Sequence, residues 1–139
     1  MTTRRLAGIS AAIEAATGAA LIADPDLVVR LLIGTALSGS GIAIGRVCGF
    51  ALLSLGLACW PNGAVVTARV AVALLSYNLL TALYLEYLGA GGSFTGYLLW
   101  PACVLHALMA VLLTRPAYDA LRRKRTGGFR STAHSAPSS

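Results

Sequence analysis

Apolar positions along this chain are grouped into four long stretches, separated by short segments rich in glycine, proline or charge. At 1.5 Å per residue, the first stretch would form a helix of about 27 Å, close to the roughly 30 Å of a bilayer's hydrocarbon core. The other three are at least as long. The pattern predicts an all-α integral membrane four-helix bundle with helices at about 6–23, 41–59, 64–88 and 94–115.

The segments between these stretches predict where each helix ends. Asp24-Pro25-Asp26 ends the first helix, because proline cannot continue it and carboxylates favour water. A helix running from there to residue 59 would reach about 50 Å, too long for one crossing. We therefore expect residues 27–37 to form a short interfacial helix. Trp60 to Gly63 and Gly89 to Ser93 are expected to be turns, and Pro101 is expected to kink the last helix.

The two ends of the chain are basic. Residues 1–5 could precede a cleaved signal sequence, but Glu14 interrupts the apolar run and no A-x-A site precedes Asp24, so we expect a retained helix. A single four-helix transmembrane domain is expected to span 1–125. Residues 126–139 are expected to be a disordered cytoplasmic tail, since they are rich in Gly, Ser and Thr.

Composition identifies the solvent of the folded chain. The sequence is 57% hydrophobic and 12% charged, with a net charge of +6. Soluble domains average about 25% charged residues, so lipid is the expected surrounding for most of this chain. The basic residues gather at both ends instead of lining a groove, which argues against nucleic-acid binding and for attraction of the tail to anionic lipid.

The same charge distribution predicts orientation. Acidic residues and one arginine flank the opposite ends of the apolar stretches: Asp24, Asp26, Glu86 and Arg30. The positive-inside rule then places both termini in the cytoplasm, in a bacterial-type inner (plasma) membrane. A membrane-protein partner or a homo-oligomer remains open.

Each predicted crossing carries a strongly polar residue at a similar depth. They are Glu14, Arg46, Asn78 and His106, with Tyr77 beside Asn78. Such residues are costly in hydrocarbon and face the interior of a bundle, where they pair with one another or serve function. These five residues form the predicted polar cluster, which is either structural or a ligand-binding site.

Small residues predict which helices approach closely. Gly41, Gly45 and Gly49 form a stripe on the second crossing, and Glu14 lies in a stripe of small residues on the first. Stripes of this kind allow close helix contact. We expect Glu14 to pair with Arg46 across that contact, either as a structural ion pair or as part of a functional site.

The chemistry-bearing residues predict no catalytic apparatus. No glycine-rich phosphate loop or nucleophile–base motif is present. Cys103 and His106 share a helical face, but a metal site needs further ligands, so no metal or other cofactor is expected. A membrane oxidoreductase using Cys48, Cys103 and His106 is the least favoured function.

Two resemblances bear on function. The stretch GRVCGFALLSLGLA at residues 45–58, followed by a turn and another apolar helix, resembles DoxX-like small four-helix inner-membrane proteins. The resemblance implies an accessory or small-ligand-binding membrane component near a quinone or thiol redox partner. This chain has Arg46 where that family usually has an acidic residue.

The second resemblance is to small multidrug resistance transporters. Those four-helix proteins carry one membrane glutamate early in their first helix, and Ile13-Glu14-Ala15-Ala16-Thr17-Gly18 is similar. This resemblance implies the alternative function, a proton-coupled small-solute transporter in which Glu14 carries the proton.

Overall fold

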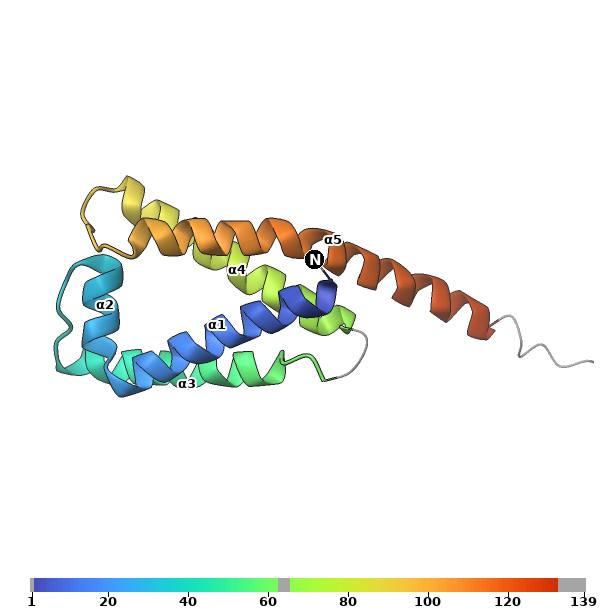
Figure 1. Ribbon diagram of the computed structural model, residues 1–139, viewed down its shortest axis with the longest axis horizontal. Coiled ribbons are helices and arrows are strands. Elements are labelled where there is room, and N and C mark those ends of the chain that lie inside the picture. The colour runs from blue at the N-terminus through green and yellow to red at the C-terminus, as the bar shows by residue number, and fades with distance from the viewer. Residues whose placement is uncertain (1, 63–65, 133–139) are drawn as a thin grey trace, which may run out of the picture.

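The described part of the chain folds into five helices, and four of them form two antiparallel pairs (Figure 1). The computed structural model describes residues 2–62 and 66–132, with side chains described as far as Arg122, and these residues include no strand. The helices are α1 (Thr3–Ala23), α2 (Pro25–Ile33), α3 (Gly39–Ala58), α4 (Ala68–Ala90) and α5 (Leu99–Thr132). Helix α1 packs mainly on α3, and α4 packs mainly on α5.

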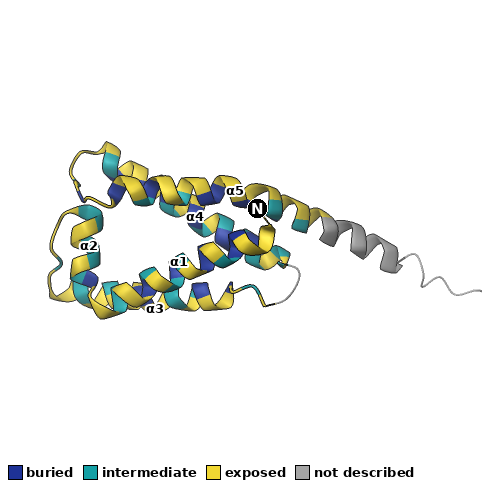
Figure 2. Cartoon of the chain, viewed as in Figure 1, coloured by how far each residue is buried: buried dark blue, intermediate teal, exposed yellow. Residues whose placement is uncertain are grey.

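Four of these helices are long and apolar enough to cross a membrane. They are α1, α3, α4 and the part of α5 from Leu99 to Arg122. Their outward faces carry large exposed apolar side chains. Figure 2 shows exposed positions along each of these helices. Such faces suit lipid and would be unfavourable in water. The predicted all-α four-helix membrane bundle is confirmed.

Glycines bring α1 and α3 into backbone contact. A Cβ atom on Gly56 would lie 2.6 Å from the carbonyl oxygen of Ala11, and one on Gly49 would lie 2.8 Å from that of Gly18. Real Cβ atoms do not approach oxygen so closely, so both positions require glycine at this helix separation. The close contact of the first two crossings, expected from small residues, is present.

The predicted glycine stripe on α3 does not face one neighbour throughout. A Cβ on Gly45 would lie 2.7 Å from the Cβ of Pro25, at the start of α2, and one on Gly41 would meet the side chain of Leu37. Only Gly49 meets α1. The stripe therefore packs against α1, α2 and the 34–38 segment in succession.

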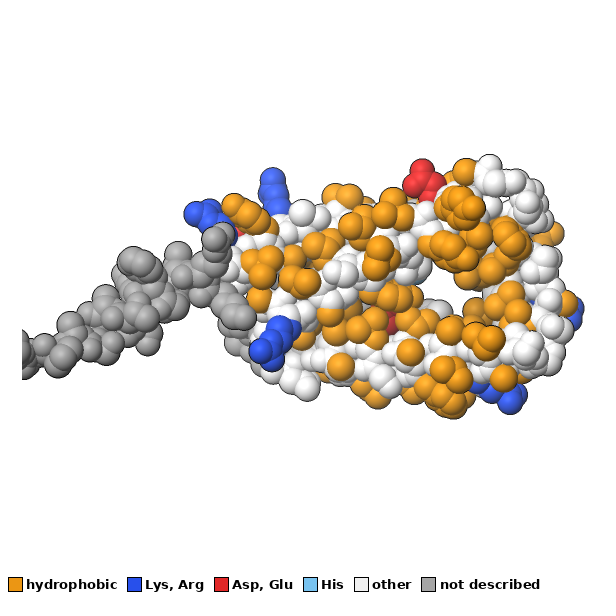
Figure 3. Space-filling model, turned by 180° about the vertical axis from the view of Figure 1, so that it is seen from behind, with side chains coloured by type: hydrophobic (Ala, Val, Ile, Leu, Met, Phe, Trp, Pro, Cys, Tyr) orange, Lys and Arg blue, Asp and Glu red, His pale blue; other side chains and the backbone are white. Residues whose placement is uncertain are grey.

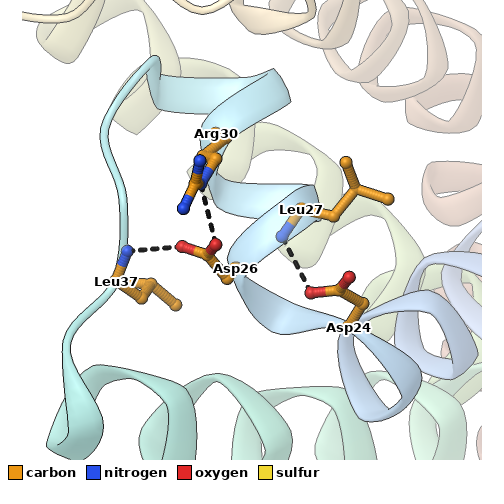
Figure 4. A network of polar contacts seen from close by, with 5 residues as sticks. All are labelled: Asp24, Asp26, Leu27, Arg30 and Leu37. Carbon is orange, nitrogen blue, oxygen red and sulfur yellow. Dashed lines mark hydrogen bonds and ion pairs between the residues drawn. The ribbon is translucent and has the colours of Figure 1, made fainter.

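The short helix α2 is held in place at both ends. The Asp24 side chain accepts a hydrogen bond from the Leu27 amide (3.0 Å), which caps the helix start. Asp26 accepts a hydrogen bond from the Leu37 amide (2.7 Å) and forms an ion pair with Arg30 (2.7 Å), as Figure 4 shows. Gly34 ends the helix in the left-handed conformation, with φ of 86°.

The end of α2 is also bonded to the segment between α4 and α5. The amide of Leu98 donates to the carbonyl of Leu31 (2.8 Å), and that of Thr95 donates to the carbonyl of Ile33 (3.2 Å). A Cβ on Gly96 would overlap the backbone of Leu32. Helix α2 lies between α1 and α3 in the sequence. Its contacts with the α4–α5 segment therefore connect the two helix pairs at one end of the molecule.

Two features of the last helix differ from expectation. Helix α5 begins at Leu99, so Pro101 lies in its first turn, where proline is tolerated, and not inside a kinked helix. The helix also continues to Thr132, so the first part of the predicted disordered tail is helical; residues 133–139 lie outside the described residues. At 34 residues, α5 spans about 51 Å, longer than a bilayer core.

Apolar contacts between the two helix pairs lie at opposite ends of the bundle. Near the chain termini, Leu74 and Leu113 pack with residues of α1 and with Cys59. At the end near α2, Leu85, Leu88, Leu99 and Cys103 pack together against Leu32 and Ile33. We call these the termini-end cluster and the α2-end cluster. Between them lie buried Asn78 on α4 and half-buried His106 on α5.

Candidate functional site: a buried polar cluster between the helix pairs

A chain of hydrogen bonds joins α1, α4 and α5 in the middle of the bundle. Nδ2 of Asn78 donates to Oγ of Ser10 (3.0 Å) and to the carbonyl oxygen of Leu74 (2.9 Å). Oδ1 of Asn78 lies 2.9 Å from Nδ1 of His106. Ser10 and Asn78 are both 1% exposed. Buried amides need such partners, and here the partners come from three helices.

The ring of Tyr77 also contacts the imidazole of His106. Its ring meets the His106 ring edge-on, with centroids 5.7 Å apart and planes at 79°. Its side chain is also close enough to Glu14 of α1 to interact with it electrostatically. The two groups do not reach hydrogen-bond geometry. Tyr77 therefore lies between His106 and Glu14 and connects them into one cluster.

Glu14 is the unusual member of this cluster. Its side chain is 1% exposed, and neither carboxyl oxygen has a hydrogen-bond partner in the described part of the chain. Leaving a buried polar group unpaired costs about 1–3 kcal/mol, so such groups call for an explanation. Within a membrane-spanning helix, an ionisable residue of this kind is a candidate functional site.

The expected partner of Glu14 is elsewhere. Arg46 is exposed on α3 and forms no ion pair with Glu14, so the predicted pair is wrong. The small residues of α1 and α3 do meet, but this contact does not bring Glu14 and Arg46 together. Arg46 starts about 10 Å along α3 from Gly39, a depth from which its long side chain can extend toward the membrane surface.

The structure thus brings together four of the five predicted site residues. Glu14, Tyr77, Asn78 and His106 form the polar cluster with Ser10, and Arg46 lies apart. Ser10 is the residue that the sequence did not single out. Its position in the sequence could have indicated it, because Ser10 lies one helical turn before Glu14 on the same face of α1.

An opening lies at the α2 end of the molecule. Figure 3 shows an opening between the α1–α3 pair and the α4–α5 pair, on the side where α2 connects them. The α2-end cluster lies at this same end of the molecule.

The cysteines do not form a reactive group with the cluster. Cys48 is exposed and Cys59 is buried in the termini-end cluster. The thiol of Cys103 donates to the carbonyl oxygen of Ala82 (3.6 Å), one turn away from His106. No group of three His, Cys, Asp or Glu side chains suited to a metal ion occurs among the described residues.

Fold and site together define the class of molecule: a multi-pass helical membrane protein with a buried polar cluster between its helix pairs. Comparison with protein-family models, with curated proteins and with solved structures gives no match. Function must therefore be argued from the cluster itself.

Proposed function

We propose that this protein binds a small, membrane-soluble ligand at the polar cluster and acts as an accessory component of a larger membrane system, without catalytic apparatus of its own. One observation supports this most strongly. Glu14 is buried, and neither of its carboxyl oxygens has a hydrogen-bond partner among the described residues, although a bundle selected only for stability would pair or replace it. The cost of keeping it is understandable if a ligand completes its hydrogen bonds.

The surroundings of Glu14 suit such a role. Tyr77 and His106 offer polar atoms and aromatic rings close by. The imidazole of His106 is hydrogen-bonded to Asn78, which is in turn hydrogen-bonded to Ser10. Apolar helix faces with a few placed polar groups are typical of small-molecule sites. Helix α1 packs mainly on α3 and much less on α4 and α5, so the two pairs can separate to admit a ligand.

The proposal includes the membrane, the orientation and the partner of the protein. We place the protein in a bacterial-type inner membrane with both termini in the cytoplasm, because basic residues gather at the terminal ends of the spans. The basic end of α5 would contact anionic lipid. The quinone or thiol redox partner rests only on the DoxX-like sequence resemblance.

Copurification tests the binding proposal. The protein would be extracted in mild detergent from its native membrane, and bound small molecules would be identified by mass spectrometry. A compound should accompany the wild type and be lost from Glu14→Gln. Glu86→Gln is the matched control, because Glu86 is an exposed glutamate near the end of α4, away from the cluster. Equal recovery from all three proteins would contradict a site at Glu14.

The same unpaired carboxyl also favours a second candidate, a proton-coupled small-solute transporter. An unpaired Glu14 between two helix pairs could exchange a proton for a solute, which a salt-bridged glutamate could not do readily. Proteoliposomes enclosing a pH-sensitive dye distinguish the candidates. A gradient of the copurified compound should move protons in the wild type and not in Glu14→Gln if transport occurs; an accessory binding protein moves none.

A further inference from the structure

The amide of Asn78 has one possible orientation. The carbonyl oxygen of Leu74 can only accept a hydrogen bond, so the atom of Asn78 that lies 2.9 Å from it must be the nitrogen. The second hydrogen of that nitrogen goes to Oγ of Ser10 at 3.0 Å. Exchanging the amide nitrogen and oxygen would bring two acceptors face to face at Leu74. The network therefore assigns the oxygen, Oδ1, to the side facing His106.

This orientation determines which nitrogen of His106 carries hydrogen. Oδ1 of Asn78 can only accept, and it lies 2.9 Å from Nδ1 of His106, so Nδ1 must be protonated. A neutral imidazole has one protonated nitrogen, which leaves Nε2 with a free lone pair. Nε2 has no hydrogen-bond partner among the described residues.

We propose that Asn78 is a positioning residue that fixes His106 in the Nδ1–H tautomer, so that Nε2 is the acceptor the cluster presents to its ligand. Asn78 does not contact the ligand in this arrangement, since its polar atoms are occupied by Ser10, Leu74 and His106. Tyr77 meets the ring edge-on and limits its rotation. His106 is half-buried on the same face of α5 as Leu99, Cys103, Ala110 and Leu113, which are buried.

The tautomer has a consequence for ligand chemistry, and this step rests on the proposed function. A ligand that meets Nε2 must donate a hydrogen bond, so it carries a hydroxyl or an N–H group. A compound with only carbonyl or ether oxygens would place two acceptors together and leave both unpaired, which disfavours binding strongly. The ligand class is therefore an uncharged, membrane-soluble molecule with a hydrogen-bond donor on an apolar body.

Nitrogen-15 NMR of imidazole-labelled protein tests the tautomer directly. The chain has two histidines, so a His134→Ala background leaves the signal of His106 alone. Protonated and unprotonated ring nitrogens resonate far apart, and we expect the protonated signal at Nδ1. A dominant Nε2–H signal in this protein would overturn the proposal whether or not any ligand binds.

Variants of the network separate positioning from simple stabilisation. Asn78→Leu removes the acceptor, so the Nε2–H tautomer should appear; a spectrum that stays entirely Nδ1–H would contradict the role of Asn78. Ser10→Ala is the matched control, since Leu74 still orients the amide and the tautomer should not change. Should Asn78→Leu fail to fold, Asn78→Asp keeps an acceptor beside Nδ1, and loss of the Nδ1–H signal there would overturn the proposal.

A pair of simple probes tests the ligand class. Phenol carries a hydroxyl donor, and anisole is the same ring with the donor replaced by a methyl ether. Phenol should shift the Nε2 resonance of His106, with the shift growing as phenol is added, and anisole should leave it unchanged. Equal shifts with both probes would contradict selection for a donor. No shift with either would show that Nε2 is closed to ligands, while the tautomer result would still stand.

Discussion

At the residue scale, the central fact is that Glu14 and Arg46, one acidic and one basic residue at similar depth, do not meet. Glu14 faces Tyr77 and the α4–α5 pair, and Arg46 is exposed on α3. Charge and depth suggested an ion pair, but the rotation of each helix about its axis decides which residues touch. The close glycine contact between α1 and α3 uses the face of α1 that carries Ala11 and Gly18.

A double-mutant cycle checks this separation. Glu14→Gln and Arg46→Gln should have independent effects, because residues without shared partners are additive within about 0.5 kcal/mol. Thermal aggregation of the purified protein in detergent gives the four stabilities. The pair Ser10→Ala and Asn78→Leu is the positive control, since these residues share a hydrogen bond. A coupling of about 1–2 kcal/mol between positions 14 and 46 would mean that the two charges meet.

At the element scale, the four crossings and the short α2 could be predicted from the sequence, because both follow from length and hydropathy. The close approach of α1 and α3 followed from glycine spacing. The partners of the polar residues could not be predicted. Asn78 bonds to Ser10 on α1 and to His106 on α5. These partners depend on which helices are neighbours in space, and the hydrophobic pattern of a helix that is apolar all round does not show this.

The close packing of α1 on α3 predicts that a substitution of Gly56 lowers the stability of the protein. Gly56→Ala should lower stability by about 1–3 kcal/mol, because the new methyl group would meet backbone atoms of Ala11 and Ala15 and the helices must move apart. Gly39→Ala is the matched control on the same helix, since no atom lies within 4 Å of that Cβ position. The control should be neutral or gain up to about 1 kcal/mol from helix propensity.

Thermal unfolding in detergent, followed by circular dichroism, measures both glycine variants. The comparison is informative because the chemical change is the same at each site and only the neighbour differs. A Gly56→Ala protein as stable as Gly39→Ala would mean that α1 and α3 are separated more widely than the structure has them. The α1–α3 pair would then no longer be a rigid unit beside the polar cluster.

At the scale of the whole molecule, two helix pairs are joined at both ends and are less closely packed between. The termini-end cluster joins them on one side, and α2 with the α2-end cluster joins them on the other. The polar cluster lies between these contacts, and Figure 3 shows an opening between the pairs near α2. In the middle, the Ser10–Asn78 hydrogen bond is the link between the pairs that the polar cluster provides.

The orientation of this assembly in the membrane is the last prediction. Four spans place both ends of the chain on the same side, and Figure 1 shows the N-terminus near the point where α5 leaves the bundle. The N-terminal end of α1 carries Arg4 and Arg5, and α5 carries Arg115 and Arg122, whereas Asp24 and Asp26 lie at the opposite end. The positive-inside rule then puts both termini in the cytoplasm.

Paired topology reporters fused after residue 125 test this orientation. Green fluorescent protein should fluoresce there, and alkaline phosphatase should be inactive, because each works on only one side of the membrane. The same reporters placed after Gly92, between α4 and α5, provide the control and should give the opposite result. Phosphatase activity after residue 125 would contradict four crossings with cytoplasmic ends. It would also place the basic part of α5 away from the anionic cytoplasmic leaflet that it is proposed to contact.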